Sequence, residues 1–230
     1  MDFSYDFTGM VFAAKMFDSF LGEGMELEEK RKKIGIMGGT FDPIHLGHLM
    51  TAEAVRDAYH LDQVLFIPAA HPPHKQQQSV TPAMHRYLMT VLATADHADF
   101  MVSSLEMQRS GPSYSIDTVQ ELIQRFGKGT EFFFIAGADA IQELPSWKRI
   151  GDLLEMCHFI AATRPGCMPD FVHLRACLGS LGEEHIHQLI TPALEISSTD
   201  IRDRVHCGHS IRYLVPAAVE QYIYKEGLYR

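Results

Sequence analysis

Short apolar runs alternate along the chain with stretches whose apolar residues recur at helical spacing. The runs are of strand length and cover residues 34–37, 63–68, 100–103, 131–139, 157–163 and 186–190. Strands that alternate with helices are typical of a parallel sheet, because each helix carries the chain back to the edge where the next strand starts. The pattern therefore predicts an α/β fold with a mostly parallel sheet.

The helical patterns start near residues 49, 82, 115 and 198, and two more cover 168–180 and 215–224. In the second of these helices, Thr81 is predicted to be the cap, with Pro82 in the first turn. Its core face is predicted from four apolar residues, Met84, Leu88, Val91 and Leu92. The helix that starts near residue 198 and the helix at 215–224 give the chain a helical C-terminal segment.

The stretch GGTFDPIHLGH, residues 38–48, joins the first strand to the first helix. In an open parallel sheet such a turn lies at the carboxyl end of a strand, where ligands bind. We expect Gly38 and Gly39 to let the backbone turn tightly, and the helix that follows to point N–H groups at a phosphate. His45 and His48 are three residues apart and share a face of the first helical turn, with Gly47 leaving room for a ligand.

A second polar stretch, ISSTDIR at residues 196–202, also combines a helix start with phosphate-binding side chains. Ser197 or Ser198 is predicted to cap the helix. Arg202 lies about one turn further along the same face as Ser198, an arrangement that suits a phosphate.

The 38–48 stretch excludes two common nucleotide motifs, because it has neither the Gly-Lys-Ser/Thr of a P-loop nor three spaced glycines. A His-x-x-His pair by itself could also indicate a metal site. The combination of strand, Gly-Gly-Thr, Asp-Pro and His-x-x-His resembles the His-x-x-His nucleotidyltransferase superfamily, and within it the nicotinate-nucleotide adenylyltransferases. The resemblance extends over about residues 33–230, although it is loose between 166 and 185. It implies a Rossmann-like, doubly wound fold of the nucleotidyltransferase type.

Further motifs carry the same resemblance: PPHK at 72–75, GPSYS at 111–115, GAD at 137–139, SW at 146–147 and RPG at 164–166. The family commonly has Thr where Ser115 stands, so the hydroxyl is kept. The resemblance implies catalytic roles for His45, His48 and Arg202. It implies ATP binding by Gly38, Gly39, Thr40, His48, Gly137, Asp139, Ser197, Ser198 and Arg202. It implies nicotinate mononucleotide binding by Lys75, Ser115, Trp147 and Arg164.

The implied reaction joins nicotinate mononucleotide to the AMP part of ATP, giving deamido-NAD and pyrophosphate. The attacking phosphate is already an anion at neutral pH, so the reaction needs alignment and charge neutralisation rather than a general base. We expect Mg²⁺ to be held mainly by ATP oxygens, with no metal site made by the protein alone. Transfer to nicotinamide mononucleotide or phosphopantetheine, and a non-catalytic nucleotide sensor, are the alternatives.

Composition limits the partners further. A net charge of −9 argues against broad binding to nucleic acid or to an anionic membrane. The four cysteines contain no Cys-x-x-Cys pair, which favours reduced thiols in a cytoplasmic protein, although an even count leaves bridges open. The HCGH stretch at 206–209 has metal-like residue types but lacks a full ligand set, so zinc is not expected. The oligomeric state stays open, and a homo-oligomer is compatible with the sequence.

Residues 1–33 precede every motif and include a second methionine, Met25. Lys15 and Asp18 interrupt the apolar residues before a signal peptide or membrane span could form. We expect an N-terminal extension, either mobile or the product of an upstream start, with a docking helix as the alternative. Residues 34–230 are then predicted to form a single nucleotidyltransferase domain.

Overall fold

The structure is a computed structural model, and it describes residues 31–72, 80–163, 170–192 and 194–230. The strands are β1 (Lys33–Gly39), β2 (Gln63–Pro68), β3 (Phe100–Val102), β4 (Glu131–Gly137), β5 (His158–Thr163) and β6 (Ile186–Ile190). The α-helices are α2 (Leu46–Tyr59), α3 (Ala83–Thr94), α4 (Ser115–Phe126), α5 (Ala138–Gln142), α6 (Ile150–Met156), α7 (Phe171–His185), α8 (Ser198–His206) and α9 (Ala217–Glu226). Two short 3₁₀ helices are η3 (Leu105–Gln108) and η4 (Leu144–Ser146).

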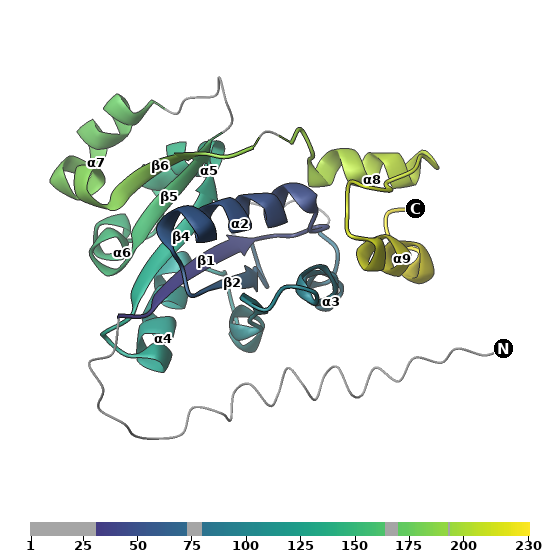
Figure 1. Cartoon of the computed structure of the whole chain (residues 1–230), viewed down its shortest axis with the longest axis horizontal. Coiled ribbons are helices and arrows are strands. Elements are labelled where there is room, and N and C mark those ends of the chain that lie inside the picture. The colour runs from purple at the N-terminus through teal and green to yellow at the C-terminus, as the bar shows by residue number, and fades with distance from the viewer. Residues whose placement is uncertain (1–30, 73–79, 164–169, 193) are drawn as a thin grey trace. The chain divides into compact units, whose positions relative to one another are not determined.

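The six strands form one parallel sheet in the order β3-β2-β1-β4-β5-β6 (Figure 1). The predicted Rossmann-like, doubly wound fold is therefore confirmed. The strand order reverses between β1 and β4, and helices leave these two strands toward opposite faces. In open α/β sheets the crevice for ligands opens at this reversal, beyond the carboxyl ends of the strands.

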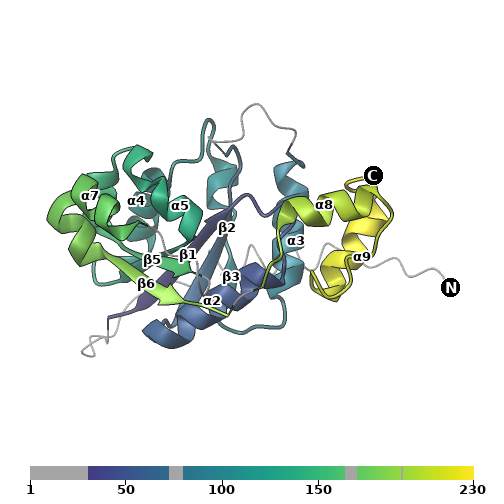
Figure 2. The ribbon, with the colours of Figure 1, turned by 90° about the horizontal axis from the view of Figure 1, so that it is seen from above.

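Helices cover both faces of the sheet, as Figure 2 shows from above. Successive residues of a strand point to opposite faces, so Ile36 belongs to one core cluster and Met37 to the other. Helices α2, α3, α8 and α9 contribute to the cluster of Met37, and helices α4, α6 and α7 contribute to that of Ile36. Since both faces are buried, the strands appear in the sequence as continuous apolar runs.

The predicted core face of α3 is partly wrong. Leu88 and Leu92 pack against the core, but Met84 is 57% exposed. The largest fully buried side chain of the helix is Arg86, which is 1% exposed. Its guanidinium donates to the carbonyl oxygens of Thr40 (2.7 Å), Thr81 (2.8 Å) and Ala70 (3.3 Å). The helix is therefore rotated from the predicted orientation, with the Arg86 side chain on its buried face. Burial of this cation is tolerated because the three carbonyls accept hydrogen bonds from it.

Three predicted boundaries also differ. Pro82 is the N-cap of α3 and Thr81 lies outside it, with its backbone N–H bonded to Asp42 Oδ2 at 3.1 Å. Strand β4 ends at Gly137, so Asp139 lies in the first turn of α5 instead of extending the strand. Helix α7 runs on to His185, past a break at Gly179 with φ 61°, and residue 168 is outside the described residues.

No helix within the described ranges combines the length and apolar character that a membrane crossing requires.

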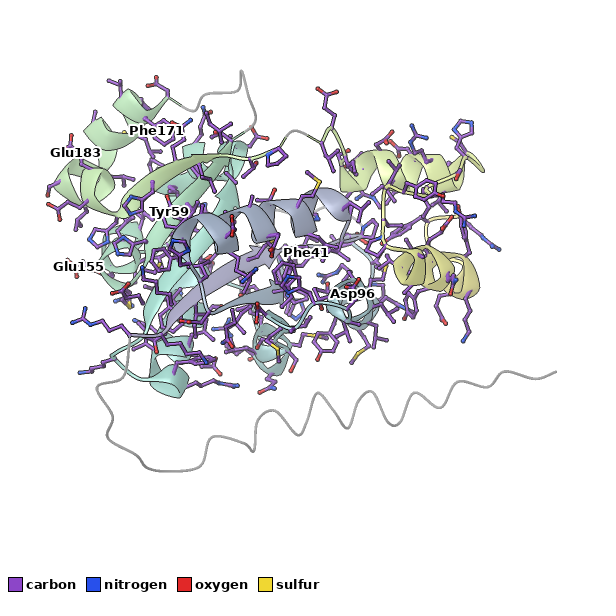
Figure 3. All side chains as sticks on the ribbon, in the orientation of Figure 1. Phe41, Tyr59, Asp96, Glu155, Phe171 and Glu183 are labelled. Carbon is purple, nitrogen blue, oxygen red and sulfur yellow. The ribbon has the colours of Figure 1, made fainter. Side chains whose placement is uncertain are left out.

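Three histidines lie close together at the amino ends of β5 and β6, opposite the carboxyl ends of these strands. His187 Nε2 lies 3.1 Å from His158 Nδ1, and the rings of His158 and His185 stack at 4.9 Å. Tyr59, at the opposite end of α2 from Phe41 (Figure 3), lies 6.2 Å from the His187 ring. Burial first, and the neighbouring imidazoles second, lower the pKa of His158 and His187 below the ordinary value.

Acid is therefore expected to destabilise the protein through these histidines. Their pKa values are lower in the folded than in the unfolded chain, so the unfolded chain binds more protons, and stability falls as pH drops below about 6.5. Melting temperatures measured between pH 7.5 and 5 should fall less steeply for His187→Gln than for the unsubstituted protein. His60→Gln, at the exposed end of α2, is the matched control and should keep the original slope. Equal slopes for all three proteins would contradict this expectation.

Candidate active site

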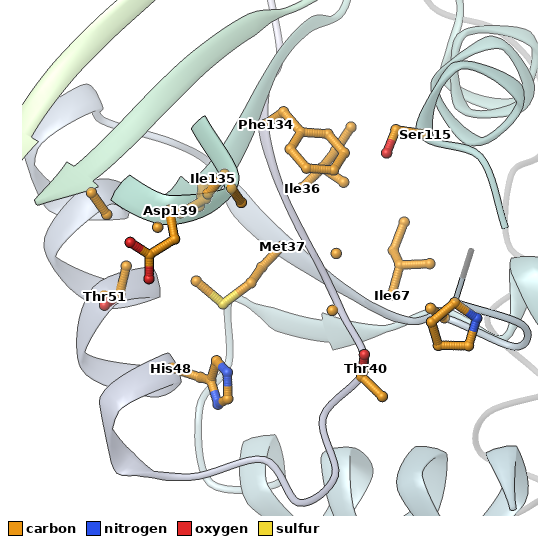
Figure 4. Close-up of a pocket in the computed structure, with 18 of the residues that line it drawn as sticks. Ile36, Met37, Thr40, His48, Thr51, Ile67, Ser115, Phe134, Ile135 and Asp139 are labelled. Atoms are coloured by element: carbon orange, nitrogen blue, oxygen red, sulfur yellow. The ribbon is translucent and has the colours of Figure 1, made fainter. Parts of the chain in front are cut away.

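One cavity of about 760 Å³ opens at the carboxyl ends of β1, β2 and β4 (Figure 4). Eleven of the residues predicted from the sequence line it: Gly38, Gly39, Thr40, His45, His48, Ser115, Gly137, Asp139, Trp147, Ser197 and Ser198. Arg202 stands outside this lining, and Lys75 and Arg164 fall outside the described residues. The strand reversal thus brings together five separate segments of the chain.

His45 and His48 form a stacked pair at the start of α2. His45 is the N-cap residue, and the two rings lie 3.8 Å apart at an angle of 29°. The backbone N–H of His45 donates to Nδ1 of His48 at 3.3 Å. Phe41 packs edge-on against the His48 ring at 5.1 Å, which fixes the ring from the other side. The predicted shared face of the two histidines is therefore confirmed.

These contacts decide the protonation of His48. Because Nδ1 accepts a hydrogen bond, the hydrogen of the neutral ring is on Nε2, which can donate to an anion in the cavity. Burial, followed by repulsion from His45, holds the pKa of His48 well below its usual value. The free site thus holds a neutral imidazole, and a bound phosphate would raise this pKa by adding negative charge.

The glycines of the turn are needed because a side chain would not fit, and not because the backbone requires a conformation that only glycine adopts. This corrects the prediction that Gly38 and Gly39 let the backbone turn tightly. A Cβ on Gly39 would lie 2.9 Å from the Phe41 ring, and one on Gly47 would lie 3.0 Å from Nδ1 of His45. The left-handed residue of the turn is Phe41, with φ 50°, and neither Gly38 nor Gly39 has a positive φ. Glycine is needed where the aromatic rings of the motif pack against the backbone.

Two polar groups stand at opposite sides of the cavity in Figure 4. Asp139, in the first turn of α5, and Thr51 of α2 both line the cavity. Ser115 is the first residue of α4, and Tyr114 rather than Ser115 is its N-cap. The cavity therefore reaches from α5 to α4, on both sides of the strand reversal.

Trp147 both packs against the core and lines the cavity. Its ring packs edge-on against Phe134 at 5.6 Å and Phe159 at 6.0 Å, so it closes part of the core. It also lines the cavity, beside Ser146 and Lys148. A ligand ring can therefore contact an indole whose position is fixed from behind.

Helix α8 brings the second motif to the turn. Ser197 is the N-cap and accepts from the backbone N–H of Asp200 at 3.0 Å, which resolves the predicted choice of cap. Ser198 donates to the carbonyl of Pro43 at 2.9 Å. Arg202 donates to the carbonyl of Asp42 at 2.8 Å, so its guanidinium binds the turn. It is not among the residues that line the cavity.

Sequence reasoning missed two charged residues of the lining. Lys148 is the one Lys or Arg among the lining residues that the structure describes; its Nζ lies 3.4 Å from Asp117 and 4.2 Å from the Tyr114 ring. Glu106 is 8% exposed and accepts from the Thr118 hydroxyl at 2.6 Å. The sequence signal for Lys148 was its position next to Trp147. Glu106 stands among polar residues, in SSLEMQR at 103–109, and has no such signal.

Comparisons with known proteins identify the family of the chain. The cytidylyltransferase-like family matches residues 36–204. A protein of Thermoanaerobacter sp., described as a probable nicotinate-nucleotide adenylyltransferase, is 49% identical over 207 residues, which are 88% of this chain and 96% of that protein. A protein of Moorella thermoacetica with the same description is 51% identical over 207 residues, 90% of this chain and 95% of that protein. The chain belongs to the nicotinate-nucleotide adenylyltransferase family.

The predicted resemblance is thus confirmed, and the protein is a nucleotidyltransferase. A solved structure of the nicotinic acid mononucleotide adenylyltransferase of Plasmodium falciparum complexed with NaAD has a TM-score of 0.71 at 21% identity. It covers 86% of this chain and 97% of that one. The same enzyme complexed with APC gives a TM-score of 0.66. At this identity the comparison shows that the adenylyltransferase fold is shared.

Proposed function

We propose that the protein transfers AMP from ATP to nicotinate mononucleotide, giving deamido-NAD and pyrophosphate in NAD synthesis. The observation that carries this proposal is the stacked His45–His48 pair at the start of α2, on the cavity at the strand reversal. High identity over nearly the whole length of relatives described as nicotinate-nucleotide adenylyltransferases supports the choice of reaction.

The chemistry requires in-line displacement at the α-phosphorus of ATP. A phosphate oxygen of the mononucleotide forms the new P–O bond, the bond to the β-phosphate bridge breaks, and the electron pair leaves with pyrophosphate. No proton has to be removed from the nucleophile, so the site needs aligned donors and not a base. Helix α2 supplies backbone N–H groups at its N-terminus, and His48 supplies its Nε2–H.

The ATP half of the site is proposed to run from the turn toward α8. His45 and His48 contact the α- and β-phosphate oxygens, with the backbone of Gly38, Gly39 and Thr40 beneath them. The pyrophosphate faces the α8 N-terminus, where Ser197 and Ser198 line the cavity. Arg202 keeps the turn in place with one nitrogen and adds positive charge behind the leaving group. Gly137 and Asp139 face the ribose.

The mononucleotide half is proposed to lie between α4 and Trp147. Trp147 stacks on the pyridinium ring, and Ser115 donates to the substituent on that ring. Lys75 and Arg164 are the further candidates from the sequence. Lys148 adds a cation to the same wall of the cavity.

Mg²⁺ fits this site as a companion of ATP. Among the described residues no three His, Cys, Asp or Glu side chains converge in a way that could hold a metal ion. Magnesium commonly keeps its waters and binds substrate phosphates, with one carboxylate added. Of the two carboxylates in the described lining, Glu106 accepts from the Thr118 hydroxyl, and Asp139 is the one that could complete such a shell. Bound magnesium would neutralise phosphate charge. We propose that the enzyme works in the cytoplasm on these two substrates.

A pyrophosphate-release assay with a panel of acceptors tests the function. Nicotinate mononucleotide, nicotinamide mononucleotide and phosphopantetheine are each supplied with ATP and Mg²⁺, and the dinucleotide product is identified by mass. We expect release with nicotinate mononucleotide and formation of deamido-NAD. Release only with another acceptor would reassign the substrate, and ATP binding without release would indicate a nucleotide sensor.

Residues 34–230 are proposed to be the single catalytic domain. In the structure, residues 31–230 form one compact unit. A chain that begins at Met25 is expected to keep its melting temperature and its kcat, because every cavity-lining residue within the described part of the chain follows residue 35. Thermal melts and the pyrophosphate assay on both chains check this. A loss of stability or turnover in the shortened chain would favour a docking segment among residues 1–24.

A further inference from the structure

The turn at Thr40–Pro43 is held by segments far away in the sequence. On one side, helix α8 binds two of its carbonyls, since Ser198 donates to Pro43 and Arg202 to Asp42. The loop before α9 adds a backbone bond of 3.0 Å from Leu46 N–H to the carbonyl of Leu214. On the other side, the buried guanidinium of Arg86 binds the carbonyl of Thr40. The C-terminal segment therefore forms one wall of the turn.

Asp42 is the centre of these contacts. It is 4% exposed, and a buried carboxylate needs a donor for each oxygen. Oδ2 accepts from the backbone of Thr81, and Oδ1 accepts from the Tyr229 hydroxyl at 2.8 Å. Burial and the adjacent carboxylate raise the pKa of Tyr229, so its O–H stays protonated and donates throughout the physiological range. Tyr229 is the penultimate residue of the chain and lies beyond the end of α9.

The positions of the two histidines depend directly on the position of Asp42. Its neighbour Phe41 has its ring against His48 and against the space that a Cβ on Gly39 would occupy. His45 follows three residues after Asp42 and donates its backbone N–H to His48. A shift of Asp42 would move both contacts that fix the His48 ring. Small displacements of a group that must meet a phosphate are costly in rate.

We propose that Tyr229 is a positioning residue for the adenylyl transfer: by donating to Asp42, the C-terminal end of the chain sets the place of His45 and His48. This inference rests on the proposed function. Tyr229 touches neither substrate in this scheme and is absent from the cavity lining. Its contribution is to the geometry of the turn and therefore to kcat, rather than to the affinity for the mononucleotide.

The test compares two tyrosines of the same segment in the full-length chain. Tyr229→Phe removes the 2.8 Å bond to Asp42. Tyr222→Phe removes a 2.8 Å bond from α9 to His85 of α3 and leaves the bonds of Asp42 in place. Melting temperature, kcat and both KM values are measured for each. We expect similar losses of melting temperature, but a drop in kcat of about 10- to 100-fold for Tyr229→Phe alone. The KM for nicotinate mononucleotide should stay unchanged.

Equal kcat values for the two variants, or a loss confined to the KM for the mononucleotide, would overturn the proposal. If Tyr229→Phe does not fold, Asp42→Asn gives the same information, because it weakens the accepted bond and keeps the shape of the turn. We expect Asp42→Asn to lower kcat, and an unchanged kcat would overturn the proposal. Where Tyr229→Phe does fold, the effects of the two substitutions on kcat should not add in a double variant. Full additivity would overturn the proposal. If the unsubstituted protein makes no deamido-NAD, the proposed function fails instead, so the two failures are distinguishable.

Discussion

Replacing His48 by alanine is expected to lower kcat by about 10²–10³-fold, ~3–4 kcal/mol, by analogy with the loss of one preorganised donor to a developing anion. The structure gives the reason, since Nδ1 is occupied by the backbone of His45 and Nε2 is left to donate. The ring is also fixed by Phe41 before substrate arrives. A donor fixed in advance contributes most where charge develops, which is at the bridging and leaving oxygens of ATP.

Steady-state kinetics with the pyrophosphate assay measure this effect. The KM for ATP should change little, because the same oxygens keep their contacts with the N–H groups of α2. His209→Ala is the matched control; it removes an exposed imidazole after α8 and should leave kcat unchanged. If His48→Ala raises only the KM for ATP with kcat intact, the role in the transition state is wrong.

Nicotinate mononucleotide is expected to be preferred over nicotinamide mononucleotide by at least ~10³-fold in kcat/KM, because a site of donors is left unpaired by an amide N–H₂. The two substrates differ only in a carboxylate against a carboxamide. The wall that would face this group has the start of α4 at Ser115 and the Nζ of Lys148. Both features favour negative charge. Lys75 is a further cation candidate from the sequence.

Competition between the two mononucleotides, followed by product mass, gives the ratio directly. Trp147→Ala is the informative variant, because stacking on a pyridinium ring does not distinguish acid from amide. It should weaken both substrates similarly and leave the ratio nearly unchanged. Comparable kcat/KM values in the unsubstituted protein would indicate a dual-specificity adenylyltransferase.

The sequence by itself determined the strands, their parallel arrangement and the position of the strand-to-helix turn at residues 38–48. Apolar runs such as 63–68 stand out because a strand buried on both faces must be apolar throughout. The pairing of His45 with His48 could be predicted because residues three apart on a helix share a face, which is a local property of the sequence. The cap of α8 at Ser197 was also local, although the choice between two serines required the structure.

The tertiary structure alone decided what surrounds the turn. Arg86 sits in the core because carbonyls from Thr40, Ala70 and Thr81 converge on it, and no periodicity in α3 reveals such acceptors. Arg202 was predicted to hold phosphate, yet its guanidinium donates to the carbonyl of Asp42. The bond from Tyr229 to Asp42 joins residues 187 positions apart. Local patterns fix helices and strands, whereas the partners of buried polar groups depend on which distant segments folding brings within hydrogen-bond distance.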